Sequence, residues 1–256
     1  MKVSIITVAY NSAKTIRDAI DSVVAQTYAD IEHLVIDGAS QDGTVEIINC
    51  YGDHVSQFVS EPDHGIYDAM NKGLKLATGD IVGFLNSDDF YHADNVIAAI
   101  AAAFMADQKL DVVFGDLVYV HPSNLNQIVR YYSSAYFHPD RLAYGWMPAH
   151  PTVFIRRPIY EKYGVFKTDY QIASDYELMV RLLARHRLMY RYIPRIMVTM
   201  RNGGVSTANL KSNWILNREI IRGCRENNIS TNFLKVYSKY LTKIWQLVQR
   251  PREMNS

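Results

Sequence analysis

The first part of the chain alternates short apolar runs with longer segments in which apolar side chains recur every three or four residues. The short runs are typical of buried strands, and the three- and four-residue spacing is typical of helices. The predicted strands cover residues 2–9, 33–36, 57–60 and 81–85, and the predicted helices cover 13–26, 45–49, 65–77 and 93–106. Strands that alternate with helices form parallel units with right-handed crossovers, so this pattern predicts a doubly wound α/β sheet.

The pattern changes after residue 106. A further strand is expected at residues 111–114, and the tyrosine-rich stretch that follows it, up to residue 136, favours antiparallel or irregular structure. Later elements are a strand at 152–156, a short helix that begins at Pro158, a helix at 173–185 and a strand at 190–200. We therefore expect a mostly parallel sheet with a small antiparallel part. Residues 1–208 are expected to form one domain of two halves, 1–92 and 93–208.

Carboxylates follow two of the predicted strands directly. Asp37 ends the second strand, and Asp88 and Asp89 come just after the strand at 81–85. Ligands bind at the carboxyl ends of strands in open α/β sheets, and adjacent carboxylates suit a divalent cation. Spacing alone is equally compatible with a polar turn or a helix cap. Ser12 is likewise expected to cap the helix that starts at residue 13.

Composition and charge narrow the class of protein. The chain has 256 residues, and its two cysteines, Cys50 and Cys224, have neither disulfide-framework nor zinc-site spacing. No signal peptide or membrane span is apparent, so we expect a cytoplasmic protein. Residues 1–208 hold 18 Lys and Arg against 23 Asp and Glu, whereas residues 209–256 hold 9 against 3. The second range is therefore predicted to be a basic helical extension, and no nucleic-acid partner is expected.

The extension is helical in pattern at residues 209–227 and 231–249. In the second helix, apolar and aromatic side chains share one face and lysines lie largely elsewhere. Two interpretations stay open. The helix packs on its own domain or on a second subunit of a homo-oligomer, or it lies through residues 231–250 in the anionic inner face of the cell membrane as a peripheral amphipathic helix.

Several motifs together carry a resemblance to a known family. The sequences SIITVAYN at 4–11, VIDGASQDGT at 35–44, NKG at 71–73 and FLNSDD at 84–89 resemble inverting family-2 glycosyltransferases of the GT-A fold, over about residues 1–206. The sequence SEPDHGIYDAMNKG at 60–73, with SDY at 174–176 and GGVS at 203–206, is similar to the branch that builds bacterial exopolysaccharides such as colanic acid. The fold class expected from this resemblance is α/β of the GT-A type. The resemblance also implies that residues 1–92 are the nucleotide-binding half of the domain and residues 93–208 its acceptor-side half.

The resemblance implies a role for each matching residue. Asp37 binds the base or ribose of the nucleotide, and the loop of Ala9, Tyr10 and Asn11 completes that pocket. Asp88, the last acid of the D-x-D motif, binds Mg²⁺ or Mn²⁺ on the diphosphate, with Asp89 beside it, and Asp175 matches the catalytic base. The other candidates for nucleotide-sugar binding are Asp68, Asn71, Lys72, Ser87, His150 and Arg201.

Two positions depart from the family pattern. Asn86 replaces the first Asp of D-x-D, which leaves fewer anionic ligands for a metal. Met70 replaces an Arg, which removes one phosphate contact that Lys72 or an arginine is expected to supply. Each functional role also has a structural alternative. These are helix capping for Asp68, a structural loop histidine for His150, a surface charge for Arg201, and a capping box of Ser174 with Glu177 around Asp175.

These residues predict a metal-dependent inverting glycosyltransferase. The donor is a nucleoside-diphosphate sugar, with UDP as the default, and the acceptor is a lipid-linked or polysaccharide hydroxyl. The alternative is a non-catalytic nucleotide-sugar binding protein on the same fold, which Asn86 keeps open. Neither G-x-G-x-x-G after the first strand nor G-x-x-x-x-G-K-[ST] is present, which disfavours a dehydrogenase or an NTPase.

Overall fold

A nine-stranded sheet organises the described part of the chain, which in this computed structural model comprises residues 1–203 and 210–238. Its strands follow the order β3-β2-β1-β4-β8-β6-β9-β5, and β7 pairs with β6. They are β1 Val3–Ala9, β2 Ile31–Asp37, β3 Gln57–Ser60, β4 Ile81–Asn86, β5 Asp89–Tyr91, β6 Val112–His121, β7 Asn124–Tyr132, β8 Phe154–Arg156 and β9 Tyr190–Arg201.

The first four strands of this order are parallel, as the sequence pattern predicted. Beyond them, β8 pairs antiparallel with both β4 and β6, and β5 and β7 are also antiparallel to their neighbours. A parallel pairing of β6 with β9 completes the second half. The expected mostly parallel sheet with a smaller antiparallel part is therefore confirmed.

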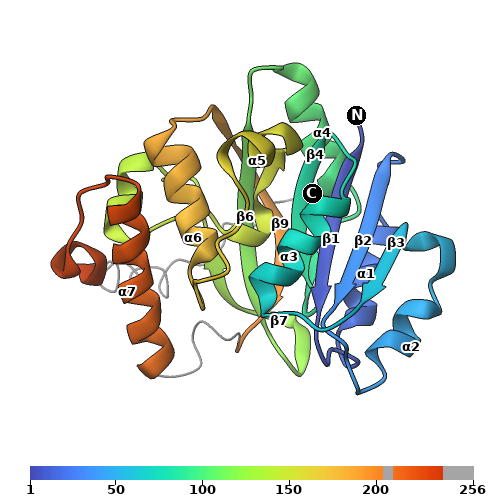
Figure 1. The fold of residues 1–256 in the computed structure, drawn as a ribbon. Helices are drawn as coiled ribbons and strands as arrows, with labels where there is room; N and C mark the ends of the chain where they lie inside the picture. Colours follow the sequence, from blue (N-terminus) through green and yellow to red (C-terminus); the bar gives the residue numbers. More distant parts are fainter. Residues whose placement is uncertain (204–209, 239–256) are drawn as a thin grey trace.

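Helices cover both faces of the sheet (Figure 1). Helices α1, α2 and α4 pack on one face, and α3, α5 and α6 pack on the other. Their bounds are α1 Ile16–Val24, α2 Thr44–Asn49, α3 Ile66–Leu76, α4 Val96–Ala106, α5 Arg157–Tyr163, α6 Ser174–Met179, which continues as a π-helical turn over Val180–Arg185, and α7 Leu210–Glu226.

Alternating side chains of the central strands supply the core of both layers. Ile5 of β1 faces the α1 and α4 layer, and Ile6 faces the α3 layer. Both are fully buried, and burying such a side chain contributes about 1.5–3 kcal/mol. Strands buried on both faces need apolar residues at every position, which explains the continuous apolar runs in the sequence.

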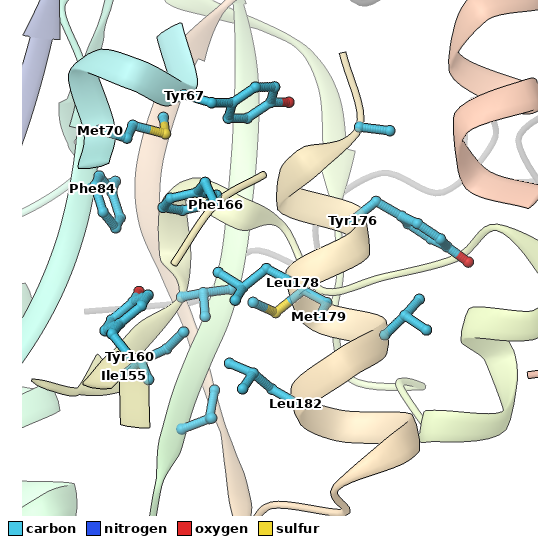
Figure 2. Packing of buried hydrophobic residues seen from close by; sticks show 14 of the residues in the cluster. Tyr67, Met70, Phe84, Ile155, Tyr160, Phe166, Tyr176, Leu178, Met179 and Leu182 are labelled. Atoms are coloured by element: carbon cyan, nitrogen blue, oxygen red, sulfur yellow. The ribbon is translucent and has the colours of Figure 1, made fainter. Parts of the chain in front are cut away.

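The α7 helix packs against α6 rather than standing apart. Ile220, Ile221 and Cys224 belong to the same buried cluster as α3 and α6. Figure 2 shows Tyr176 of α6 directed away from Phe84 and Phe166, and its hydroxyl lies 3.6 Å from the Cys224 sulfur. Val236, in the helical residues 233–238, is also fully buried in this cluster. The start of the second tail helix therefore packs on its own domain, while residues 239–249 of that predicted helix lie outside the described residues.

One helix begins later than predicted. The N-cap of α1 is Thr15, because residues 12–15 form a separate turn in which the Thr15 amide donates to the Ser12 carbonyl. The Ser12 hydroxyl is instead 2.8 Å from the Ser87 hydroxyl. The predicted role of Ser12 as the N-cap is therefore wrong. The predicted glycine turn at 203–206 lies outside the described residues from Gly204 onward.

Gly73 allows α3 to approach the sheet closely, and its replacement should be costly. A Cβ at this position would lie 2.4 Å from Cγ2 of Ile6. Alanine normally stabilises a helix interior by roughly 0.5–1 kcal/mol over glycine, but overpacking costs about 1–3 kcal/mol. We expect Gly73→Ala to lower the free energy of unfolding, measured by urea titration. Gly223→Ala in α7, where the nearest atom is 3.3 Å away, is the matched control and should cost less. Equal or higher stability of Gly73→Ala would contradict the packing.

Candidate active site

The ends of three parallel strands lie side by side. In the strand register Ala9 is opposite Asp37, and Val8 is opposite Asn86. The Gly38 amide donates to the Ala9 carbonyl at 2.9 Å, and the Ser87 amide donates to the Val8 carbonyl at 3.3 Å. The segments that the sequence singled out after β1, β2 and β4 therefore form one edge of the sheet.

Asp37 is fixed by the turn that follows it. Its buried carboxylate accepts from the Ser40 amide at 2.9 Å and from the Ser60 hydroxyl at 2.7 Å, and it also bonds the Ser40 hydroxyl. The Asn11 amide donates to the same Ser40 hydroxyl at 2.7 Å. The turns after β1 and β2 are thus joined, and the Tyr10 ring stands 66% exposed beside them.

Asp63 belongs to this edge, although it was not among the predicted site residues. A Cβ at Gly38 would lie 2.5 Å from Oδ2 of Asp63 and 3.2 Å from the Tyr10 ring. Asp63 is half-buried and accepts from the Gly65 amide at 2.8 Å. The rule that singled out Asp37 and Asp88 applies here too, because Asp63 follows the end of β3. Tyr10, Gly38 and Asp63 therefore lie close together at the carboxyl edge of the sheet.

The adjacent acids after β4 have opposite environments. Asp88 is exposed, whereas Asp89 is fully buried as the first residue of β5. Burial, together with the charge of Asp88, raises the pKa of Asp89 well above its usual range. Asn86 Nδ2 donates to Asp89 Oδ2 at 3.1 Å, and Oδ1 of Asp89 has no partner in the described residues. Asn86 is the residue that replaces the first Asp of the D-x-D motif. Its side chain therefore forms a hydrogen bond with the buried carboxyl group of Asp89.

The described residues contain no group of three or more His, Cys, Asp or Glu side chains that would hold a metal. The exposed carboxylate of Asp88 and the orphaned buried oxygen of Asp89 nevertheless lie in consecutive residues at the strand end. Mg²⁺ is commonly held by one or two carboxylates together with substrate phosphates and water. The arrangement fits a cation of this kind, with Asp88 as the accessible ligand. Direct binding by the buried Asp89 stays a prediction.

The two predicted phosphate contacts already have protein partners. Arg201 donates to the Asp88 carbonyl at 2.5 Å and forms an ion pair with Asp18. Lys72 forms an ion pair with Glu61 at 2.9 Å and donates to a backbone carbonyl of the same loop. Arg201 is therefore held next to the strand end, and Lys72 is held to the loop after β3.

Asp68 and Asn71, both on α3, make structural contacts. Asp68 accepts from the His64 amide at 3.0 Å, which agrees with its capping alternative. The side chain of Asn71 exchanges two hydrogen bonds with the backbone of Phe166, at 2.8 and 3.0 Å. Met70 is buried in the core beside Phe84 and Phe166, as Figure 2 shows, so this position contributes packing. Helix α3 is thereby joined to the segment that leads into α6.

Asp175 lies in the first turn of α6 and is half-buried. Its Oδ1 accepts from the Tyr176 amide at 2.8 Å and lies 3.3 Å from the Tyr67 hydroxyl. The same hydroxyl is 2.5 Å from the Ile172 carbonyl. Among the described residues Oδ2 of Asp175 has no hydrogen-bond partner. One carboxylate oxygen is therefore anchored, and the other is available.

Burial raises the pKa of Asp175, although His150, the Tyr176 amide and the Tyr67 hydroxyl each oppose the rise. The His150 ring is packed 5.9 Å from the Phe84 ring and 5.8 Å from the Phe166 ring. Burial lowers the pKa of His150, and the nearby Asp175 carboxylate counteracts this. This packing agrees with the alternative that His150 is a structural loop histidine.

The predicted capping box around Asp175 is wrong. The N-cap of α6 is Ala173, and the Ser174 hydroxyl has no hydrogen-bond partner among the described residues. Glu177 turns inward and forms an ion pair with Arg181 at 2.8 Å. Glu219 of α7 binds the segment before the helix, because its carboxylate accepts from the backbone amides of residues 171, 172 and 173 at 2.7–2.9 Å. The sequence analysis did not find this role, because Glu219 is 46 to 48 residues away from these amides in the sequence.

The parallel unit with acids at its carboxyl edge, joined to a mixed second half, is the GT-A fold. The chain belongs to the family described as glycosyl transferase family 2, whose model matches residues 4–164. It is 28% identical over 223 residues to a PGL/p-HBAD biosynthesis glycosyltransferase of Mycobacterium tuberculosis, which covers 86% of this chain and 82% of the relative.

Two solved structures show the same fold at 20% identity. The mannosyltransferase PcManGT from Pyrobaculum calidifontis, in complex with GDP-Man and Mn²⁺, matches with a TM-score of 0.66 over 96% of this chain and 72% of its own. The S. aureus protein TarS 1–349, in complex with UDP-GlcNAc, matches with a TM-score of 0.64 over 96% and 73%. Against the longer TarS chain, the match spans 44% of that protein.

The role of Glu219 in holding the segment before α6 can be tested by Glu219→Gln. Hydrogen bonds to a charged group contribute about 1.5–3 kcal/mol each, and glutamine keeps only a neutral acceptor, so we expect a loss of about 1–3 kcal/mol in the free energy of unfolding. The control is Glu161→Gln, which removes an exposed ion pair with Arg157 and should cost at most about 1 kcal/mol. Equal stability of the two variants would show that Glu219 does not anchor this segment.

Proposed function

We propose that the protein is an inverting glycosyltransferase that moves a sugar from a nucleoside-diphosphate sugar to an acceptor hydroxyl, with Asp175 as the catalytic base. The observation that carries this proposal is the half-buried Asp175 carboxylate, with one oxygen anchored and the other free. Its partner Tyr67 lies in the first turn of α3, which follows β3 and so begins at the carboxyl edge of the parallel strands. The base candidate is therefore beside the edge that carries Asp37, Asp63 and Asp88.

The proposed donor site is the edge itself. Tyr10, Asp37 and Asp63 would hold the base and ribose, and Asp88 would hold Mg²⁺ or Mn²⁺. A bound cation would neutralise the charge that develops on the leaving diphosphate. UDP remains our default donor nucleotide. The solved complexes of similar fold contain UDP-GlcNAc and GDP-Man with Mn²⁺, which supports a nucleotide sugar but leaves the base open.

In the proposed reaction the acceptor oxygen attacks the anomeric carbon as its bond to the diphosphate breaks. Oδ2 of Asp175 takes the proton of the acceptor hydroxyl. A single displacement of this kind inverts the anomeric configuration, by the reasoning that separates inverting from retaining glycosidases. Burial makes the ionised Asp175 a stronger base because it raises the pKa. Activity then requires the ionised form and falls as the pH drops through that pKa.

The proposed acceptor is lipid-linked or a growing polysaccharide, in cell-surface polysaccharide synthesis. The relative named for PGL/p-HBAD biosynthesis supports a role in making a glycosylated cell product. The resemblance of residues 60–73 to the exopolysaccharide branch stays a prediction. A non-catalytic nucleotide-sugar binding protein is the second candidate. The observation that favours it is Asn86, whose side chain supports Asp89 and leaves Asp88 as the accessible acid of this turn.

Two substitutions separate the two candidates. Asp175→Asn should lower turnover by about 10²–10⁴-fold, the usual contribution of a general base, and leave nucleotide binding intact. Asp88→Asn should instead weaken the binding of the nucleotide in Mn²⁺ and have little effect in EDTA. We would measure binding of UDP, GDP and dTDP by calorimetry and turnover by release of the nucleotide from the corresponding sugar donors.

Each result has a distinct meaning. Full turnover in Asp175→Asn would remove Asp175 as the base. Nucleotide binding that is the same in Mn²⁺ and in EDTA, and the same in Asp88→Asn, would contradict the metal-assisted donor site. Tight nucleotide binding by the unmodified protein without turnover of any donor, in the presence of candidate acceptors, would favour the non-catalytic protein.

The Tyr67 hydroxyl is expected to tune Asp175. Removing a hydrogen bond to the charged carboxylate raises its pKa, so Tyr67→Phe should move the acidic limb of the pH profile of kcat to higher pH. Tyr160→Phe is the control, because this buried tyrosine also packs on Phe166 but its hydroxyl has no hydrogen-bond partner in the described residues. If Tyr67→Phe lowers kcat but leaves the acidic limb of the pH profile unchanged, Tyr67 has only a structural role.

A further inference from the structure

The outer face of α7 carries aromatic and cationic side chains that are exposed. Trp214 is 53% exposed and Leu234 is 84% exposed, and Phe233 and Tyr237 are also exposed. Arg218 and Arg225 lie on the same side of the molecule. We call this set the α7 patch, which consists of Trp214, Arg218, Arg225, Phe233, Leu234 and Tyr237. Large apolar side chains that cluster at the surface beside charges commonly mark an interaction site.

The α7 patch is continuous. Trp214, Arg218 and Arg225 are four and seven residues apart, so they share one face of the helix. The Arg218 guanidinium lies 4.5 Å from the centre of the Trp214 ring. Arg218, Arg225 and Phe233 line one groove, and the rings of Phe233 and Tyr237 are 6.3 Å apart. The short helix at 233–238 therefore extends the surface that α7 begins.

The cations of the α7 patch have no carboxylate partner within residues 1–203 and 210–238. Arg222, which lines the same groove, differs because it forms ion pairs with Asp169 and Glu226. Arg218 and Arg225 are thus free to meet an external anion. On the opposite face of α7, Ile220 and Cys224 are buried in the core. The α7 patch therefore has a fixed orientation relative to the rest of the domain.

We propose that the α7 patch binds the surface of a membrane that contains anionic phospholipid. Aromatic side chains suit the boundary between headgroups and acyl chains, and arginines suit the lipid phosphates. No helix within the described ranges is long and apolar enough to span a bilayer, so the contact would be peripheral. The sequence pattern expected such a face only within residues 231–250. The structure adds α7 to it and turns Val236 inward.

This inference deepens the proposed function, since a surface-bound enzyme would meet a lipid-linked acceptor, but its test does not depend on turnover. The full chain is sedimented with vesicles of phosphatidylcholine alone or of phosphatidylcholine with phosphatidylglycerol. We expect binding to the second kind only. Arg218→Gln with Arg225→Gln should weaken it about tenfold to thirtyfold, as expected for the loss of two basic residues at an anionic surface. Trp214→Ser with Phe233→Ser should weaken it as well.

The control is Arg17→Gln with Lys109→Gln, which removes the same charge from exposed positions outside the α7 patch. This control should bind the vesicles as the unmodified protein does. Inorganic phosphate at matched ionic strength should not release the unmodified protein from the vesicles. Equal loss in the control, equal binding to neutral vesicles, or release by phosphate would each overturn the proposal. The far-UV circular dichroism of every variant shows whether it is folded, and a failure of vesicle binding leaves the result for Asp175 unaffected.

Discussion

The close contact of α3 with both halves of the molecule is the constraint on which the site depends. Gly73 lets the helix lie against Ile6 of β1, so α3 is seated on the parallel strands. From its other side, Asn71 holds the backbone of Phe166, and the Tyr67 hydroxyl reaches the Ile172 carbonyl and Asp175. The carboxyl edge of the sheet and the start of α6 are therefore placed by one short helix. A shift of α3 would move the base candidate relative to Asp88.

Burial gives similar carboxylates different chemistry. Asp88 is exposed and keeps its charge accessible, whereas Asp89 is enclosed and its raised pKa favours the neutral form. Asp175 lies between these cases, because burial raises its pKa while three neighbours stabilise its charge. A partly shielded carboxylate with a free oxygen suits a base, and an exposed carboxylate suits a cation ligand. Local burial therefore distinguishes these acids in accessibility and in pKa, which the motifs in the sequence did not predict.

The sequence predicted the parallel half well, because both of its signals are local. Apolar runs mark the buried strands, and acids mark their carboxyl ends, so Asp37 and Asp88 were placed from spacing and resemblance together. It failed where a distant partner decides. Asp89 is buried because it opens β5 opposite Met200 of β9, and the amides before α6 are held by Glu219 of the distant helix α7. The spacing of apolar residues within α6 or β5 does not predict contacts with such distant segments.

The two faces of α7 link the base candidate to the outside of the molecule. Glu219 and Asn227 on the buried side hold the amides before α6 and the carboxylate of Glu177 within it. Trp214, Arg218 and Arg225 point outward from the same helix. The inner face of α7 is fixed to α6 by hydrogen bonds and packing. If the outer face were bound to a membrane, α7 would hold Asp175 at a fixed distance from that membrane and in a fixed orientation. Such a link favours acceptors presented at that surface, because positioning a reacting hydroxyl is itself a large part of catalysis.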